Sequence, residues 1–228
     1  MVEILYKTSD IVIITKPYGM PSEPDPSGDK DALTATSEIL TSLGERGCVY
    51  PVHRLDRVVG GVMMIARNKR SAAALSQLVQ ERMPKKEYLA VVEGVPTEGV
   101  YEDLILKDAR RGMAVILDKP DRGSKPCSLS LSVISTVSTE RGEKSLVYLS
   151  LGTGRFHQIR AQLSSRKHPI VGDGKYGSHD KSKSGIALFS CRLSVPTSGR
   201  AIDVTALPAT SDYPWSLFEK YIKKDIFI

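Results

Sequence analysis

The chain has 228 residues, a length that suits one large domain or two small ones, and its composition is that of an ordinary globular protein. Lysine and arginine total 32 against 26 acidic residues, so the formal net charge is +6 and a polyanionic partner is favoured. Three isolated cysteines argue against a disulfide framework and a zinc site. No signal core follows the N-terminus and no apolar run approaches the roughly 20 residues that cross a bilayer, so we expect a cytoplasmic protein without a membrane partner.

Short apolar runs, many of them alternating with polar residues, predict a largely antiparallel sheet. Turn residues separate these runs, and residues 124–126 are expected to be a loop. The expected strands comprise residues 4–6, 11–15, 62–66, 85–94, 100–106, 113–117, 129–133, 146–151, 186–195 and 201–206.

Helices are expected at four places between or after these strands. Asp31 can cap a helix that runs to Leu43 and stops at Gly44. Asn68 can cap a second helix, and the turn Gly152-Thr153-Gly154 leads into a third. The region from Tyr213 to Ile222 is predicted as a terminal helix.

The stretch His53-Arg54-Leu55-Asp56-Arg57 places one carboxylate between two arginines, directly before an apolar strand. An ordinary surface ion pair would explain this cluster if it stood alone. However, the strand next to it is apolar and a second arginine-rich motif recurs over residues 155–160. A partly buried carboxylate beside an arginine stays ionised, so Asp56 is a candidate nucleophile or base.

Other chemistries lack their motifs. No two of the four histidines have the spacing of a helical zinc site, so no metal is expected. Gly152-Thr153-Gly154 lacks the lysine and hydroxyl of a nucleotide-binding loop, so no nucleotide cofactor is expected either. Tyr88 follows two lysines and reads equally as a core aromatic or as a stacking platform for a base.

Four motifs, in this order, resemble those of RluA-type RNA pseudouridine synthases, and the opening Lys16-Pro17-Tyr18-Gly19-Met20 resembles the start of that family. The motifs are His53-Arg54-Leu55-Asp56, Lys86 to Gly94, Gly154-Arg155-Phe156-His157-Gln158-Ile159-Arg160, and His168 to Gly177. The resemblance implies an α+β fold, with a mixed, largely antiparallel sheet, flanking helices and a central cleft. It also implies one catalytic domain over residues 1–228, without the N-terminal S4 RNA-binding domain that the family often carries.

Residue roles follow from the same resemblance. Asp56 corresponds to the catalytic carboxylate, Arg160 to the arginine that pairs with it, and Tyr88 to the aromatic that stacks on the target base. Arg54 corresponds to the residue that fills the gap left by an extruded nucleotide. The remaining polar residues of the two arginine motifs that we expect to contact RNA are His53, Arg57, Arg155, His157 and Gln158.

The implied activity is isomerisation of uridine to pseudouridine in structured rRNA or tRNA, by a monomer that needs no cofactor. The aspartate has three open roles: attack on the sugar, attack on the base, or abstraction of a sugar proton. A catalytically idle RNA-binding protein on the same fold is the alternative, and the intact Asp56, Tyr88 and Arg160 argue against it. A nucleoside hydrolase or glycosidase would need a second carboxylate or a metal near Asp56, and the sequence offers neither there.

Two departures from the family pattern bear on substrate preference. Val59-Gly60-Gly61 stands where the family usually has Thr-Ser-Gly, and Leu188-Phe189-Ser190 stands where it often has Leu-His-Ala. Neither change removes a residue assigned to chemistry. The sequence selects neither the RNA nor the uridine that is modified.

Overall fold

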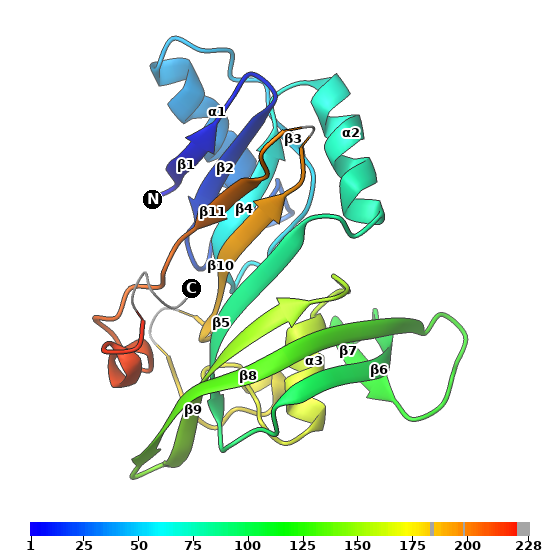
Figure 1. The fold of residues 1–228 in the computed structure, drawn as a ribbon, viewed down its shortest axis with the longest axis vertical. Helices are drawn as coiled ribbons and strands as arrows, with labels where there is room; N and C mark the ends of the chain where they lie inside the picture. Colours follow the sequence, from blue (N-terminus) through cyan, green and yellow to red (C-terminus); the bar gives the residue numbers. More distant parts are fainter. Residues whose placement is uncertain (183–184, 198, 223–228) are drawn as a thin grey trace. The chain divides into compact units, whose positions relative to one another are not determined.

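The computed structural model describes residues 1–182, 185–197 and 199–222 (Figure 1). The chain forms two compact units: Met1–Lys86 with Phe189–Pro208, and Glu87–Leu188 with the segment that begins at Ala209. The expectation of a single catalytic domain stays a prediction. In the part of the chain that is described, no helix is long and apolar enough to span a bilayer.

The first unit is organised by two antiparallel neighbours, β2 (Ile11–Lys16) and β4 (Gly60–Ala66). Around them β1 (Glu3–Lys7) pairs with β2, β3 (Tyr50–Pro51) with β4, and β11 (Ile202–Thr205) with β10 (Leu188–Val195). β4 and β10 run parallel, whereas the other pairs are antiparallel. The sheet is therefore mixed and largely antiparallel, as expected.

Both helices of the first unit begin where their caps predict. The Asp31 carboxylate accepts the N–H groups of Leu33 and Thr34 at the start of α1 (Ala32–Ser42), and Asn68 forms a capping box with Ser71 at the start of α2 (Lys69–Gln80). These bonds satisfy backbone donors that have no partner within a helix.

One face of this sheet carries the core of the first unit. Its buried members are Ile11, Ile13, Val62, Met64, Leu193, Val195 and Val204. Leu75, Leu78 and Val79, from one stripe of α2, pack against that cluster. Every residue of β4 is buried, which matches a strand with both faces covered rather than one facing water.

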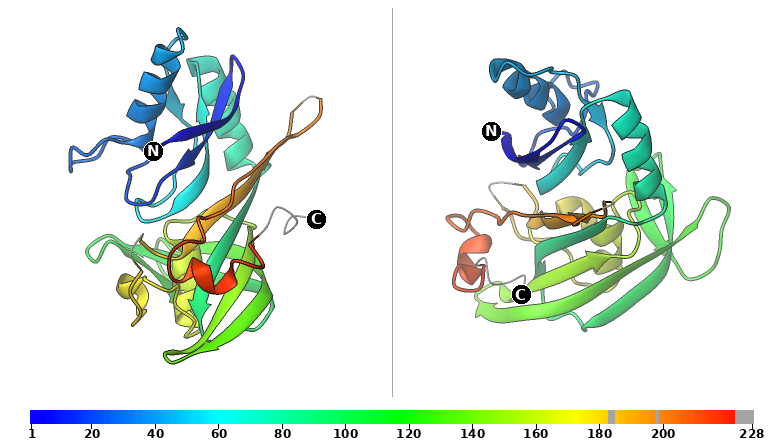
Figure 2. Two further views of the ribbon diagram at one scale, coloured as in Figure 1. Left: turned by 90° about the vertical axis from the view of Figure 1, so that its left-hand side faces the viewer. Right: turned by 45° about the horizontal axis from the view of Figure 1, so that its top comes forward.

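The second unit is an antiparallel sheet in the order β5 (Lys85–Glu93), β9 (Gly142–Leu151), β8 (Lys125–Thr139), β6 (Gly99–Asp108), β7 (Met113–Leu117). The helix α3 (Gln158–Ser165) packs on β6 and β7, and the short turn η1 (Gly174–Tyr176) follows it (Figure 1). The buried cluster here consists of Ile105, Ala114, Cys127, Ala161 and Tyr176. In the colours of Figure 1, the views of Figure 2 show β8 and β9 as long strands that lie side by side in this unit.

The expected loop over residues 124–126 is wrong for Lys125 and Pro126, because β8 begins at Lys125, whereas Ser124 lies before the strand. Pro126 pairs in register with Leu104 of β6, whereas the pairing of β8 with β9 starts only at Leu129. A proline lacks the N–H that a second neighbouring strand would require, and this part of β8 has only one. The proline therefore marks a one-sided strand end rather than a loop.

The expected terminal helix over Tyr213 to Ile222 is also wrong. In its place lies η2 (Trp215–Phe218), a single 3-10 turn that begins after Pro214. Residues three apart eclipse one another in such a turn, and Trp215 and Phe218 are both buried. In the sequence, two buried aromatic residues three apart look like the apolar face of a longer helix. Here they are buried by a single turn.

Candidate active site

His53 opens the first arginine motif and is directed inward. Its Nε2 accepts the backbone N–H of Met64 in β4 at 3.0 Å. Burial, with the charge of Lys86 as a smaller cause, lowers the pKa of His53 to about 3, so the ring is neutral. The imidazole thus fastens the motif to the strand, and its contact with RNA stays a prediction.

The two arginines of this motif face solvent and meet acids of the proline-rich loop before α1. Arg54 Nη1 lies 2.7 Å from Glu23 Oε1, and its side chain is 68% exposed. Arg57 forms ion pairs with Asp25 and Asp29. Exposed pairs of this kind contribute little to stability and are easily exchanged. Both guanidinium groups are therefore accessible and can exchange their partners, and their contact with RNA stays a prediction.

Asp56 lies between these arginines, half-buried, in a tight turn closed by the Val59 N–H bond to its carbonyl at 2.9 Å. Beneath the turn lies Lys16, which is completely buried. Its ammonium donates to the carbonyl oxygens of Pro17, Met20 and Arg57 at 3.0, 2.8 and 3.3 Å. The Lys16 amine therefore links three backbone carbonyls on the inner side of the motif.

Burial lowers the pKa of Lys16 to about 7, and the carboxylate of Asp56 opposes this shift. Sequence reasoning assigned Lys16 no role, although it stands in the opening motif that supported the resemblance. The available signal was a lysine at the end of a strand whose other residues, apart from Thr15, are apolar. Such a lysine is either exposed at the strand's end or buried with partners, and only the packing shows which.

The two departures from the family pattern meet in space. Gly60 is in register with Phe189 across the parallel β4–β10 pair, and the Tyr18 ring lies 6.1 Å from that of Phe189. A Cβ on Gly60 would approach the Tyr18 ring to 3.1 Å. The aromatic pair thus occupies space that a side chain at position 60 would need.

Gly61 is required for a different reason. Its φ is +117°, and a Cβ there would lie 2.2 Å from the carbonyl oxygen of Ser190. Any other residue would force β4 and β10 apart, since the obstacle is backbone rather than a flexible side chain.

The second arginine motif begins with a polar network around Gln158. The Gln158 side-chain oxygen accepts the Thr153 hydroxyl at 2.6 Å and the Arg155 N–H at 3.0 Å, and its amide donates to Ser128 and Gln162. Gln158 is buried, so it shapes the turn that leads into α3. Its contact with RNA stays a prediction.

Arg160 is buried within the second unit and holds Asp173 with two bonds, Nε to Oδ2 at 2.7 Å and Nη2 to Oδ1 at 2.9 Å. Its guanidinium carbon also lies 4.8 Å from the centre of the Tyr176 ring. Bidentate pairs fix the orientation of an arginine. Sequence reasoning did not identify Asp173 as this partner, although it quoted the motif from His168 to Gly177 that contains it. The pairing of Arg160 with Asp56 stays a prediction.

The residues between these two features flank the helix start. Arg155 is partly buried and donates from Nε to the Pro126 carbonyl at 3.2 Å. His157 precedes α3 in a left-handed conformation, with φ at 51°, and its Nδ1 lies 2.9 Å from the Tyr176 hydroxyl. Burial, then the charges of Arg160 and Lys175, lower its pKa to about 4. Whether either residue contacts RNA stays a prediction.

Tyr88, the third residue expected in catalysis, lies on β5 opposite Leu149 of β9 and is 6% exposed. Its backbone is thus fixed on both sides of the residue by the ladder with β9. The role of Tyr88 as a base-stacking residue stays a prediction.

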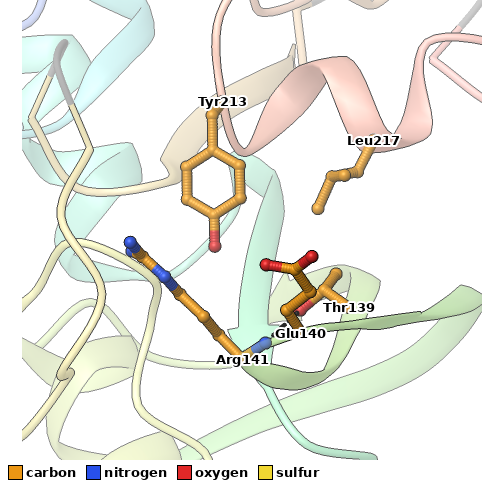
Figure 3. Close-up of a pocket in the computed structure, with 5 residues that line it drawn as sticks. All are labelled: Thr139, Glu140, Arg141, Tyr213 and Leu217. Carbon is orange, nitrogen blue, oxygen red and sulfur yellow. Dashed lines mark hydrogen bonds between the residues drawn. The ribbon is translucent and has the colours of Figure 1, made fainter.

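A separate polar cluster lies at the turn between β8 and β9. Thr139, Glu140, Arg141, Tyr213 and Leu217 line a cavity of about 360 Å³, with the last two descending from the C-terminal segment (Figure 3).

A buried ion pair lies beside this cavity. The buried Lys144 and the Tyr213 hydroxyl each lie 2.9 Å from Asp180 Oδ2. Burial and the bond to Asp180 raise the pKa of Tyr213 to about 12. The cluster therefore ties the segment around Asp180 to the hairpin. Across the described residues, no group of three or more His, Cys, Asp or Glu side chains is arranged to hold a metal ion.

Comparisons with known proteins agree on one family. A family model described as RNA pseudouridylate synthase matches residues 10–165. The tRNA pseudouridine synthase C of Haemophilus ducreyi is 30% identical over 235 residues, covering 94% of this chain and 93% of that protein. RNA pseudouridine synthase 7 of Arabidopsis thaliana is 33% identical over 183 residues, covering 77% of this chain and 45% of that protein.

A solved structure shares the fold. The human RNA pseudouridylate synthase domain containing 4 superposes with a TM-score of 0.76 at 23% identity, covering 96% of this chain and 93% of that one. The expected α+β fold with a mixed, largely antiparallel sheet is thereby confirmed, while its central cleft stays a prediction.

Proposed function

The chain belongs to the RNA pseudouridylate synthase family, and from this premise we propose that it modifies uridine in a structured tRNA or rRNA through Asp56. Membership makes it an isomerase, an RNA pseudouridine synthase. The observation that carries the proposal is the family match over residues 10–165, a span that contains Asp56, Tyr88 and Arg160.

The reaction suits a site built from one carboxylate. The bond between the ribose and the uracil nitrogen breaks, the base turns, and the ribose is rejoined to a uracil carbon. Breaking a glycosidic bond develops positive charge on the sugar, which a fixed carboxylate can stabilise or capture. The turn that holds Asp56 is anchored by His53 and by Lys16, so we assign the carboxylate a fixed position.

The surroundings of Asp56 support binding of a nucleic acid. A target nucleotide must leave its stack, at a cost of a few kcal/mol, before its base can react. We assign Arg54 to the gap that the nucleotide leaves and Arg57 to a phosphate, because both are exposed and their ion pairs are with exchangeable surface acids. Arg160 and Tyr88 are proposed to act with Asp56, Arg160 through its guanidinium and Tyr88 by stacking on the base.

We assign tRNA as the first substrate to test. The relatives from Haemophilus ducreyi and Yersinia pestis that cover most of this chain are both named tRNA pseudouridine synthase C. A monomer that acts in the cytoplasm on a stem-loop is the working expectation.

The test compares pseudouridine formation in bulk tRNA and in rRNA by the wild type and by Asp56→Asn. The variant should lose turnover completely and bind RNA nearly as well as the wild type, because only the ionised carboxylate is removed. Asp118→Asn makes the same chemical change at an exposed aspartate outside the motifs and should keep full activity.

Two outcomes would contradict the proposal. Normal turnover by Asp56→Asn would remove the aspartate from the mechanism. RNA binding by the wild type with no pseudouridine in any RNA pool would instead support a catalytically idle binding protein.

A further inference from the structure

Phe156 is a large aromatic residue that the core does not use. It lies in the turn before α3 and is 36% exposed. Its ring stacks on the imidazole of His157, with the ring centres 3.8 Å apart and the planes inclined by 18°. The Phe156 ring is not inserted into the core. Because it stacks on a flat partner at the surface, it faces solvent in a defined orientation.

The support under this ring is rigid. The Tyr176 hydroxyl accepts the backbone N–H of Ala114 at 2.7 Å, so its own proton is available for Nδ1 of His157, 2.9 Å away. The Tyr176 ring meets the His157 ring edge-on at 76°. Burial and neighbouring cations lower the pKa of His157 to about 4, so the imidazole under the Phe156 ring is neutral.

The column of rings leads from the surface to Arg160. Phe156 stacks on His157, His157 contacts Tyr176, and the Arg160 guanidinium carbon lies 4.8 Å from the centre of the Tyr176 ring. All four residues belong to the second unit. A molecule stacked on Phe156 would therefore be linked by a chain of contacts to Arg160, the arginine that we assign to the reaction.

Two lysines lie beside the column of rings. The ammonium of Lys107, on β6, lies 4.8 Å from the centre of the Phe156 ring. Lys175, in η1, reaches the turn between β6 and β7, where its Nζ would lie 3.3 Å from a Cβ on Gly112. Both lysines are exposed, and an aromatic face beside exposed cations is the arrangement that single-stranded nucleic acid requires.

We propose that Phe156 is a stacking platform for one unpaired base of the RNA, and that Lys107 and Lys175 bind the phosphates beside that base. Every base has a flat π-face, so the platform accepts any of them and selects for an unpaired nucleotide rather than for a sequence. Lys107 leaves the ring for a phosphate when the base arrives. This subsite rests on the proposed function, since it assumes an RNA substrate, but it lies outside the residues assigned to the reaction.

The first experiment uses the full chain and a short oligouridylate with one 2-aminopurine at each position in turn. Stacking quenches the fluorescence of this base analogue, so the wild type should quench it most strongly at one position. Phe156→Leu should lose that quenching and bind about 5- to 30-fold more weakly, and Phe156→Tyr should keep both. Val100→Ala, which changes another exposed apolar residue, is the matched control and should behave as wild type.

A double-mutant cycle separates stacking from a general loss of structure. An abasic nucleotide at the quenched position should weaken binding to the wild type as much as Phe156→Leu does, and should weaken binding to Phe156→Leu no further. Additive losses would overturn the proposal, as would equal quenching by the wild type and Phe156→Leu.

Salt dependence tests the lysine. Lys107→Gln should lower the slope of log affinity against log salt by about 0.7, the value for one phosphate contact on a single strand, and should retain the quenching. Phe156→Leu should leave the slope unchanged. An unchanged slope in Lys107→Gln would overturn the assignment of Lys107.

Measuring pseudouridine formation by the same wild-type preparation distinguishes failure of the stacking platform from failure of the proposed function. Activity without position-dependent quenching overturns the platform and leaves the proposed function intact. Quenching that depends on Phe156, in a protein that forms no pseudouridine, supports the platform and overturns the proposed function.

Discussion

Arg54 reaches Glu23 across the surface and is largely exposed, whereas Arg160 is buried and grips both oxygens of Asp173. Both residues belong to arginine-rich motifs that look alike in the sequence. An exposed pair exchanges its partner at little cost, whereas a buried bidentate pair cannot be opened without leaving a charge stranded. The arginines of the first motif can therefore exchange their partners, whereas the second motif fixes an arginine in place.

The inner side of the first motif is nevertheless as rigid as the second motif. His53 binds the backbone of β4, and Lys16 binds three carbonyls below the turn. The motif thus combines a fixed backbone with exchangeable side chains. This is what a site needs if it must hold one carboxylate still and release two arginines to an arriving polyanion.

Breaking the buried pair should have the largest effect on stability. Arg160→Ala leaves the Asp173 carboxylate buried without a cation and should lower the free energy of unfolding by about 3–5 kcal/mol. Urea unfolding measures this loss, with Arg54→Ala as the exposed counterpart. If Arg160→Ala lowers the free energy of unfolding no more than Arg54→Ala does, the buried pair is no more important for stability than the exposed one.

Lys16 should make stability depend on alkaline pH. Its pKa is about 7 in the folded chain and about 10.4 when unfolded, so the unfolded state binds more protons between these values. The free energy of unfolding should therefore rise from pH 7 towards pH 10 in the wild type, relative to Lys16→Met, by on the order of a few kcal/mol. Parallel curves for the two proteins would show that Lys16 is not held in this buried environment.

His53 should make the free energy of unfolding fall at acid pH. Its pKa is lowered to about 3, so the folded state resists protonation that the unfolded state accepts below its ordinary value near 6.5. Stability due to the neutral ring is complete above pH 6.5 and is lost by up to about 1.4 kcal/mol per pH unit as the pH falls towards 3. His53→Gln should flatten this acid limb in urea titrations, and His179→Gln, at an exposed histidine, should leave it unchanged.

The exposed arginines should have the smallest effect on stability and a clear one on binding. Arg54→Ala and Arg57→Ala should each change the free energy of unfolding by less than about 1 kcal/mol. Arg57→Ala should lower the salt slope of RNA affinity by about 0.7 to 0.9, because Arg57 is the arginine assigned to a phosphate. Glu23→Gln should strengthen RNA binding, because it frees Arg54 from its competing acid; weaker binding by this variant would show that the pair itself shapes the site.

Local signals in the sequence were reliable where one residue controls one element. Asp31 and Asn68 start α1 and α2 as their capping chemistry requires. The loop expected at Pro126 and the helix expected over Tyr213 to Ile222 were wrong for a common reason. In both cases the outcome depended on what lies beside the segment, a single neighbouring strand in one and a buried anchor in the other.

The sequence by itself determined the family, the largely antiparallel sheet and the identity of the candidate residues, because these follow from motif order, periodicity and capping within the chain. Only the tertiary structure decided which polar side chains turn inward. Lys16 had no assigned role and His53 and Gln158 were expected to contact RNA, and in the structure each is bonded to backbone groups of a distant segment. Whether a polar side chain is buried depends on whether the fold supplies partners for all its donors and acceptors, and those partners lie far away along the chain.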